Sequence, residues 1–596
     1  MVQRHFYDVV IVGAGGAGLR AAIEAHESGA RTAVVCKSLL GKAHTVMAEG
    51  GIAASMGNVY PEDNWKVHFR DTMRGGKMLN HWRMAQLHAQ EAPDRVRELE
   101  DWGALFDRTP AGLISQRDFG GHRFARLAHV GDRTGLELIR TLQQRVVQLG
   151  IDVFMECTVT KLLTDDNGIT GAFGYRRQDG EFLSWQAPSV VLATGGIGKS
   201  YVVTSNSWEY TGDGHSLALQ AGATLVNMEF VQFHPTGMVW PISVKGILIT
   251  ESVRGEGGVL KNSEGRRFMF DYIPPYFASE TADTEEEADR WYDDHANNRR
   301  PPELLPRDEV ARAINSEVKA GRGSPHGGVF LDIASRRSAA DIMKRLPSMY
   351  HQFKELAEVD ITKEPMEVGP TCHYVMGGVE VDPDTAAAKV PGLYAAGEVA
   401  GGMHGSNRLG GNSLSDLLVF GRRAGGSAAA YAKTRAGGAR LTDEVLAAAE
   451  EHALAPLARQ GGENPYTIHR DLQETMNELV GIIRTAPEVQ QALDKIEALK
   501  VRAQALSVEG QRPYNPGWHL SLDLPNMLRV SECIARAALE RQESRGGHTR
   551  DDFPTPTPEW GGLNLICSEQ DGSIALTRQP LPQMPDDLAE LFEEKK

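Results

Sequence analysis

A glycine-rich loop near the start of the chain is the feature that most restricts its possible folds. Gly13-Ala14-Gly15-Gly16-Ala17-Gly18 follows the apolar segment 7–12, and a second apolar segment lies at 31–36. The pattern predicts a buried strand, a tight turn, a helix over 17–28 and a second parallel strand. Glycines let a backbone turn sharply and approach a ligand closely, and a helix N-terminus favours a phosphate group. This order is typical of a Rossmann-like, dinucleotide-binding α/β domain.

The second predicted strand lacks the acidic residue that binds ribose in many NAD-binding proteins, because Cys36-Lys37-Ser38 stands at its end. The pattern therefore disfavours NAD and leaves ribose recognition to another segment. Two later apolar segments, at 189–196 and 392–398, also end in small residues where a cofactor can approach.

A chain of 596 residues is too long for a single core, so we expect several domains. Residues 1–237 and 355–440 are predicted to form the dinucleotide-binding domain, and 238–354, richer in charge and proline, an inserted α+β capping domain. Helical spacing after 441 predicts a helical domain over 441–550, followed by an extended tail over 551–596. The acid-rich segment 280–294 is interpreted as a solvated loop or short helix. The helical spacing is carried by Ile468, Leu472, Met476, Leu479, Val480 and Ile483, and by Met527, Val530, Ile534 and Ala537.

Composition excludes several classes of protein. A net charge of −16 argues against a nucleic-acid partner. The five cysteines include no C-x-x-C pair, which fits a reducing compartment and argues against an iron–sulfur cluster or other metal held by this chain. No apolar stretch reaches the roughly 18 residues that a membrane span needs. The first strand begins within a few residues of Met1, which leaves no room for a signal peptide, so we expect a chain that is soluble by itself.

His44 gives the sharpest indication of chemistry. It lies in Lys42-Ala43-His44-Thr45-Val46-Met47-Ala48-Glu49-Gly50-Gly51, shortly after the glycine loop. A histidine just past the first βαβ unit can reach the isoalloxazine end of a flavin whose pyrophosphate lies on the loop. His44 is therefore a candidate for covalent flavin attachment.

Further segments combine glycines with cationic and hydrogen-donating side chains. A dicarboxylate needs such groups at both ends, and the planar fork of arginine binds a carboxylate bidentately. Taken singly, each has a plain explanation, as a turn histidine or a surface ion pair. Their occurrence together behind a flavin-type unit favours a dicarboxylate site. The segments are Gln232–Gly237, Thr250–Gly258, Pro306–Asp308, His373–Gly378 and His404–Leu414.

From Tyr7 to Arg550 the chain resembles the flavoprotein subunit of succinate dehydrogenase and fumarate reductase. The resemblance implies FAD bound covalently through His44, and a proton transferred by Arg307 and supplied through Glu251 and Arg254. It implies that the substrate carboxylates are bound by His234, Thr250, His373 and Arg408. The implied FAD-binding residues are Gly13, Ala14, Gly15, Gly16, Ala17, Gly18, Lys37, Ser38, Thr45, Glu49, Gly50, Gly51, Ala193, Thr194, Gly195, Asp213, Glu398, Arg408, Ser413 and Leu414.

The activity that the resemblance implies is oxidation of succinate to fumarate. Electrons would pass through an iron–sulfur subunit, then through a membrane anchor to quinone, at the cytoplasmic face of the bacterial inner membrane. The alternatives are a quinol-linked fumarate reductase, L-aspartate oxidase or a soluble fumarate reductase, the last two with non-covalent FAD, and a flavin-containing binding protein without catalysis. Glu49 stands where many relatives carry Gln, which places a carboxyl close to the flavin. The direction of the reaction and the quinone type stay open.

Overall fold

A parallel sheet lies at the centre of the fold. The computed structural model describes residues 2–294, 297–435 and 442–593. The strands of this sheet stand in the order β18-β11-β2-β3-β7. Their bounds are Val9–Val12 (β2), Thr32–Val35 (β3), Asp152–Phe154 (β7), Ser189–Leu192 (β11) and Leu393–Ala395 (β18).

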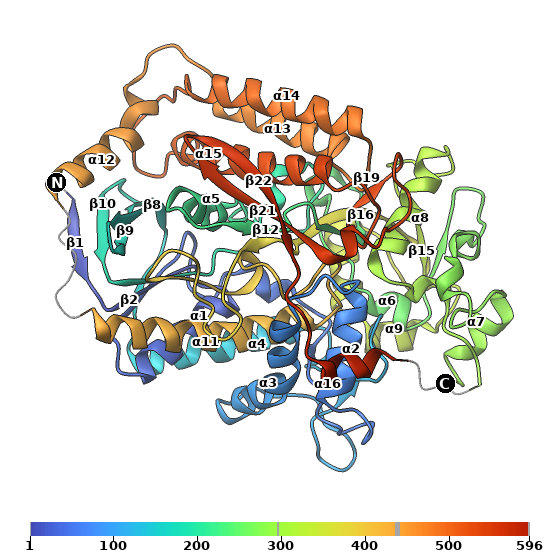
Figure 1. The fold of residues 1–596 in the computed structure, drawn as a ribbon. Coiled ribbons are helices and arrows are strands. Elements are labelled where there is room, and N and C mark those ends of the chain that lie inside the picture. Colours follow the sequence, from blue (N-terminus) through green and yellow to red (C-terminus); the bar gives the residue numbers. More distant parts are fainter. Residues whose placement is uncertain (1, 295–296, 436–441, 594–596) are drawn as a thin grey trace.

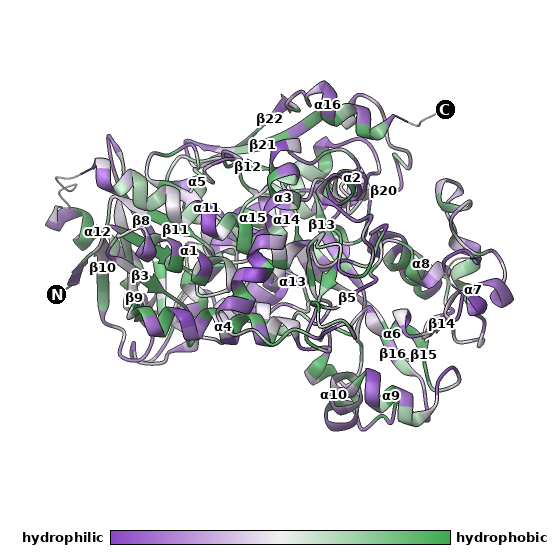
Figure 2. Ribbon diagram, turned by 90° about the horizontal axis from the view of Figure 1, so that it is seen from below, coloured by the Kyte–Doolittle hydropathy of each residue, from purple (hydrophilic) through white to green (hydrophobic). Residues whose placement is uncertain are grey.

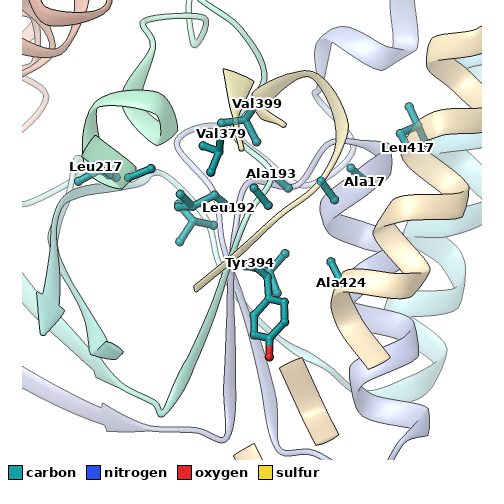
Figure 3. Close-up of a cluster of buried hydrophobic side chains, with 14 of the residues drawn as sticks. Ala17, Leu192, Ala193, Leu217, Val379, Tyr394, Val399, Leu417 and Ala424 are labelled. Carbon is teal, nitrogen blue, oxygen red and sulfur yellow. The ribbon is translucent and has the colours of Figure 1, made fainter. Parts of the chain in front are cut away.

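The first strand, loop and helix form as predicted. The turn after β2 leads into α1 (Gly16–Glu27), which returns the chain to β3. α1 packs against α11 (Asn412–Thr434), and Figure 3 shows Ala17 beside Leu417 in the buried apolar cluster that also holds Leu192 of β11. These small and branched side chains allow close packing of helix on sheet, which positions the glycine loop rigidly.

Further strands and helices surround the central sheet. A second sheet, ordered β1-β10-β9-β8, lies beside it (Figure 1). Its strands are Gln3–Phe6 (β1), Cys157–Asp165 (β8), Gly168–Arg176 (β9) and Phe182–Gln186 (β10). Short strands Ile52–Ala53 (β4), Gln116–Arg117 (β5) and Leu127–Ala128 (β6) pair together, and the helices are Trp65–Gly75 (α2), Trp82–Asp101 (α3), Thr134–Leu149 (α4) and Asp213–Gln220 (α5).

The inserted region has a hydrophobic core of its own, built from residues between Met238 and Val368. Its sheet has the order β13-β16-β15-β14, and the long strands β13 and β16 connect it to the rest of the chain. The acid-rich segment contains a short helix, α7. The strands are Val231–Met238 (β13), Val259–Lys261 (β14), Val329–Asp332 (β15) and Met366–Val375 (β16), and the helices are Ser252–Gly255 (α6), Glu285–Trp291 (α7), Arg307–Lys319 (α8), Ala339–Arg345 (α9) and Pro347–Ala357 (α10).

The C-terminal region is helical, with one difference from the predicted pattern. Ile483 does not continue a helix, because α13 ends at Leu479 and β19 (Ile483–Arg484) pairs with β20 (Thr549–Arg550) instead. Gly481 between them weakens the helix, and strand pairing there overrides the apolar spacing. The helices are Asp443–Ala458 (α12), Pro465–Leu479 (α13), Ala486–Ala503 (α14) and Pro516–Glu540 (α15).

The tail folds back over the other domains. β21 (Leu563–Gln570) and β22 (Ser573–Pro580) form a hairpin whose first strand pairs with β12 (Leu225–Val226), which in turn pairs with β17 (Gly378–Val379). α16 (Asp586–Ala589) then reaches α2 and α3 (Figure 1). Helices such as α4 and α9 carry both hydrophobic and hydrophilic residues along their length (Figure 2). Within the described ranges, the helices are all too short or too polar to cross a membrane.

Candidate active site

A deep cavity opens at the carboxyl ends of the central strands and extends to the inserted region. The empty space in this cavity is about 1010 Å³, and part of that space is open to solvent. A second cavity shares Gly15, His44, Thr45, Gly195 and Tyr210 with the first, so the two form one elongated cleft. A cleft of this length, with a glycine loop at its middle, fits a flavin dinucleotide.

The glycine loop fits this group in detail. Gly13 has a φ of +114°, and a Cβ there would lie 2.1 Å from the Ala193 carbonyl oxygen. A Cβ on Gly18 would lie 2.0 Å from the Gly13 carbonyl oxygen, so Gly18 permits close packing and does not line the cleft. The Gly15 Cβ position is open, with the nearest side-chain atom 3.7 Å away at Thr45. The backbone N–H groups at the start of α1 therefore face a space that a pyrophosphate can occupy.

Lys37 does not point freely into the cleft. Its ammonium group donates to Thr211, to Asp213 at 2.9 Å and to Asp523 of α15 at 2.7 Å. The two carboxylates outweigh burial and raise the pKa of Lys37. The side chain therefore links α5 and α15 at the wall of the cleft, which Lys37, Ser38 and Asp213 all line.

His44 lies where the two halves of the cleft meet. Its Nε2 is 3.4 Å from the Asn206 side-chain nitrogen, and its Nδ1 is buried without a hydrogen-bond partner. Burial, then the charges of Arg408 and Lys199, lower the pKa of His44 to about 4. The imidazole is therefore neutral near pH 7 and keeps a lone pair available for bonding.

Two more histidines and an arginine converge opposite His44. The rings of His234 and His373 have centroids 5.3 Å apart, and both line the cavity. His234 Nδ1 is held by Thr236 and His373 Nδ1 by the Ser205 hydroxyl, which leaves each Nε2 for a ligand. Burial and neighbouring arginines lower the pKa of both histidines well below the usual value.

Arg408 is held by two hydrogen bonds from its guanidinium group. The group donates to the Ser413 hydroxyl at 2.7 Å and to the Gln232 side-chain oxygen at 3.0 Å, and it lies over the Tyr374 ring. Burial and the charge of Arg307 lower the pKa of Arg408 to about 9, and its Nε has no partner. Thr250 lines the same cavity. This cationic, largely buried wall is suited to a carboxylate ligand.

Arg307 begins a chain of charged groups that leads away from the cavity. Its Nε donates to Glu251 at 3.1 Å, and its Nη1 is buried without a partner. Glu251 lies 4.0 Å from Arg254, which is fully buried and does not line the cavity. Burial alone would raise the pKa of the Glu251 carboxyl, but Arg307 and Arg254 outweigh it and hold the pKa below its usual value. Arg307 and Glu251 are therefore hydrogen-bonded to each other, and Arg254 lies within ion-pair distance of the same carboxylate.

Two carboxyl groups face the cavity without a paired cation. Burial, and the charge of Asp132, raise the pKa of Glu49 to about 8, and Glu49 Oε2 has no hydrogen-bond partner. Burial also raises the pKa of Glu398 to about 8, although its Oε1 accepts from the Val375 N–H at 3.0 Å. Both groups are therefore protonated and uncharged near pH 7.

The protonation of Glu49 predicts a pH dependence. Its pKa rises from the ordinary 4.5 to about 8 in the folded chain, so the native state holds an extra proton between these values and loses stability as the pH rises through 8. Above pH 8 the ionised carboxylate repels an anionic substrate, so the KM should rise roughly tenfold between pH 7 and 9. Glu49→Gln should reduce this rise in steady-state KM profiles, and the part that remains would belong to Glu398, whose pKa is also about 8. A profile that Glu49→Gln leaves unchanged would assign the rise to another group.

The structure brings most of the sequence-predicted residues to one cleft; their roles as ligands stay predictions. The aromatic side chains of the cavity were missed. Phe119, Tyr210 and Tyr374 line it, and Arg307 lies over the Phe119 ring. The only signal in the sequence is their position beside glycines: Phe119 directly precedes a Gly-Gly pair, and Tyr210 directly precedes the Thr-Gly-Asp-Gly segment. Such a position alone is weak evidence for a site. The predicted residues that line the cleft are Gly13, Ala14, Gly15, Gly16, Ala17, Lys37, Ser38, His44, Thr45, Glu49, Gly50, Gly51, Ala193, Thr194, Gly195, Asp213, His234, Thr250, Glu251, Arg307, His373, Glu398, Arg408, Ser413 and Leu414.

Comparison with known proteins identifies the family of the chain. Residues 8–414 match the FAD binding domain family, and residues 469–585 match the family described as fumarate reductase flavoprotein C-term. The chain is 44% identical to one of the subunits of fumarate reductase (CoM/CoB) from Methanothermobacter marburgensis, over 93% of this chain and 95% of that one. It is 38% identical to the fumarate reductase flavoprotein subunit of Escherichia coli K12, over 91% and 88%. The solved structure of Mycobacterium smegmatis Sdh1 in complex with UQ1 has 62% identity and a TM-score of 0.87, covering 100% of this chain and 97% of that one.

Proposed function

The chain belongs to the family of flavoprotein subunits of succinate dehydrogenase and fumarate reductase, and we propose that it oxidises succinate to fumarate with FAD bound covalently through His44. The electrons leave through an iron–sulfur subunit, then through a membrane anchor to quinone. The chain works at the cytoplasmic face of the bacterial inner membrane, held there by these partner subunits.

One observation carries the proposal: His234, His373 and Arg408 converge on a single buried cavity that His44 and Arg307 also line. A dicarboxylate bound by the first three side chains presents its central carbons between the other two. Such clamping at both ends positions the substrate and stabilises developing charge, which supplies most of the catalysis.

The residues around the clamp support a route for the proton. Arg307 carries the proton between the substrate carbon and Glu251, whose contact with Arg254 continues the route. Because arginine hardly loses its proton in water, this role requires the dry, cationic surroundings that the cavity provides. Arg307 takes the proton from carbon as it passes one to Glu251.

FAD fits the cleft that the glycine loop, α1 and α11 outline. When bound, FAD accepts the hydride that the substrate carbon loses. The backbone at the N-terminus of α1 would hold its pyrophosphate, Ser38 and Asp213 would hold its ribose, and His44, Ser413 and Leu414 would hold its isoalloxazine ring. The neutral imidazole of His44 has the lone pair that covalent attachment needs.

The reverse reaction, quinol-linked fumarate reduction, is the second candidate. Relatives named fumarate reductase and relatives named succinate dehydrogenase both match nearly the whole chain. The same residues serve both directions, so the partner subunits and the quinone set the direction. L-aspartate oxidase is a weaker candidate, because it holds FAD without a covalent bond and His44 is unnecessary to it.

Anaerobic titration of the FAD-loaded chain tests the proposed reaction. Succinate should bleach the flavin absorbance, and fumarate should restore it. L-aspartate should leave the oxidised spectrum unchanged. Bleaching by L-aspartate but not by succinate would replace the proposal with the oxidase.

A further inference from the structure

A group of buried histidines outside the cavity remains unused by this mechanism. His68, His88 and His122 lie beneath the start of α11, each at most 2% exposed. The rings of His68 and His122 have centroids 5.9 Å apart. In the described part of the chain, no group of three or more His, Cys, Asp or Glu side chains is placed to hold a metal ion. Their ring nitrogens instead contact Gly410, just before α11, and Asn412 and Ser415 within it.

We infer that His122 is a positioning residue for the dicarboxylate site, because its Nε2–H fixes the carbonyl of Gly410 and with it the loop that carries Arg408. This inference rests on the proposed function of the cavity. His122 Nε2 lies 2.7 Å from the Gly410 oxygen, and both residues are buried. A carbonyl only accepts hydrogen bonds, so the proton must be on Nε2.

The other ring nitrogen fixes this tautomer. His122 Nδ1 lies 3.5 Å from Nη1 of Arg126, which can only donate. Arg126 is itself fully buried and held by Asp63 and Asp71 at 2.9 Å each. Burial and the charge of Arg126 lower the pKa of His122 to about 3, so the ring stays neutral at working pH. The aspartates therefore orient the arginine, and the arginine orients the imidazole.

Gly410 occupies a tight position between two cavity side chains. A Cβ there would lie 2.3 Å from the Phe119 ring and 3.2 Å from Arg307 Nη2. The peptide stands two residues after Arg408 and directly before Gly411, the N-cap of α11. A rotation of this peptide would tilt the loop that holds Arg408, beside Phe119 and Arg307. A displacement of even 1 Å in such a site weakens catalysis strongly.

Substitution of His122 tests the inference through binding. His122→Leu leaves the Gly410 carbonyl without its donor and should raise the KM for succinate and the Kd for malonate roughly tenfold, with kcat changed less. His122→Gln places an amide N–H near the Nε2 position and should restore values within about twofold. Kd is read from the flavin absorbance of the full FAD-loaded chain during titration with malonate.

His88→Leu is the matched control, because it removes an equally buried imidazole from the same cluster. His88 Nε2 lies 2.7 Å from the Ser415 hydroxyl, which also reaches the carbonyl oxygens of Gly411 and Asn412. Its loss should lower the melting temperature but leave the malonate Kd within about twofold. A Kd shift as large as that of His122→Leu would reduce the role of His122 to packing.

Other outcomes separate this inference from the proposed function. If His122→Leu does not fold, His122→Asn keeps a polar amide that is too short to reach Gly410, and it should show the same rise in Kd. A normal Kd in the folded variants, or a Gln variant as weak as Leu, would overturn the inference. A wild-type chain that binds no malonate and is not bleached by succinate would instead overturn the proposed function.

Discussion

Arg307→Ala should lower the rates of succinate oxidation and fumarate reduction roughly a thousandfold or more, while FAD content stays normal. In the proposed mechanism Arg307 transfers a proton in the transition state, and removing such a group typically costs two to four orders of magnitude. Arg307 also lines the proposed substrate cavity. Arg307 and its partner Glu251 belong to the inserted region and Arg307 lies over the Phe119 ring, whereas the predicted FAD-binding glycine loop follows β2. Steady-state kinetics in both directions and the flavin absorbance of the purified protein measure these effects.

Arg307→Lys separates charge from geometry. Lysine keeps a positive charge but lacks the planar fork, so the contact with Glu251 and the free Nη1 cannot both be reproduced. We expect Lys to recover substrate binding better than turnover. Arg345→Ala, on exposed α9, controls for the loss of a cation from the same region and should leave kcat unchanged. Substantial turnover by Arg307→Ala would assign the proton transfer to another group.

The fold near the glycine loop could be predicted almost residue by residue. A continuous apolar run, a glycine at a positive φ and an amphipathic stretch all favour the same strand, turn and helix there, so local and global preferences agree. The predicted helix over 17–28 is α1 at Gly16–Glu27. At Ile483 the two preferences disagree, because long-range pairing with Thr549 competes with helical spacing and prevails.

The geometry of the candidate site could not be read from the sequence. His234 and His373 are 139 positions apart, and their approach depends on the pairing of β13 with β16. That register contains irregularities between Gln232 and Phe233, which no local pattern reveals. His122 gave no signal, because its importance comes from Gly410, a residue 288 positions away. Motifs indicated the candidate side chains of the site, and tertiary pairing decides which of these side chains lie close together.

His44→Ser should keep FAD in the cleft but lose succinate oxidation far more than fumarate reduction. The cleft residues that would hold the dinucleotide are unchanged, so non-covalent binding persists. Attachment through an imidazole withdraws electron density from the flavin ring and raises its reduction potential. Because succinate is a weak reductant, its oxidation depends on that higher potential, whereas fumarate reduction proceeds from a flavin of lower potential.

Flavin fluorescence on a denaturing gel distinguishes the two forms of binding directly. The wild-type band should fluoresce and the His44→Ser band should not, although both native proteins carry FAD. Asn206→Ala is an informative companion, because it removes the side-chain nitrogen 3.4 Å from Nε2 while keeping the histidine, so its band should still fluoresce. Equal losses in both directions for His44→Ser would show that the bond serves retention of FAD and not its potential. A wild-type band without fluorescence, from cells able to attach flavin, would transfer the assignment to L-aspartate oxidase or a soluble fumarate reductase, since neither requires the bond.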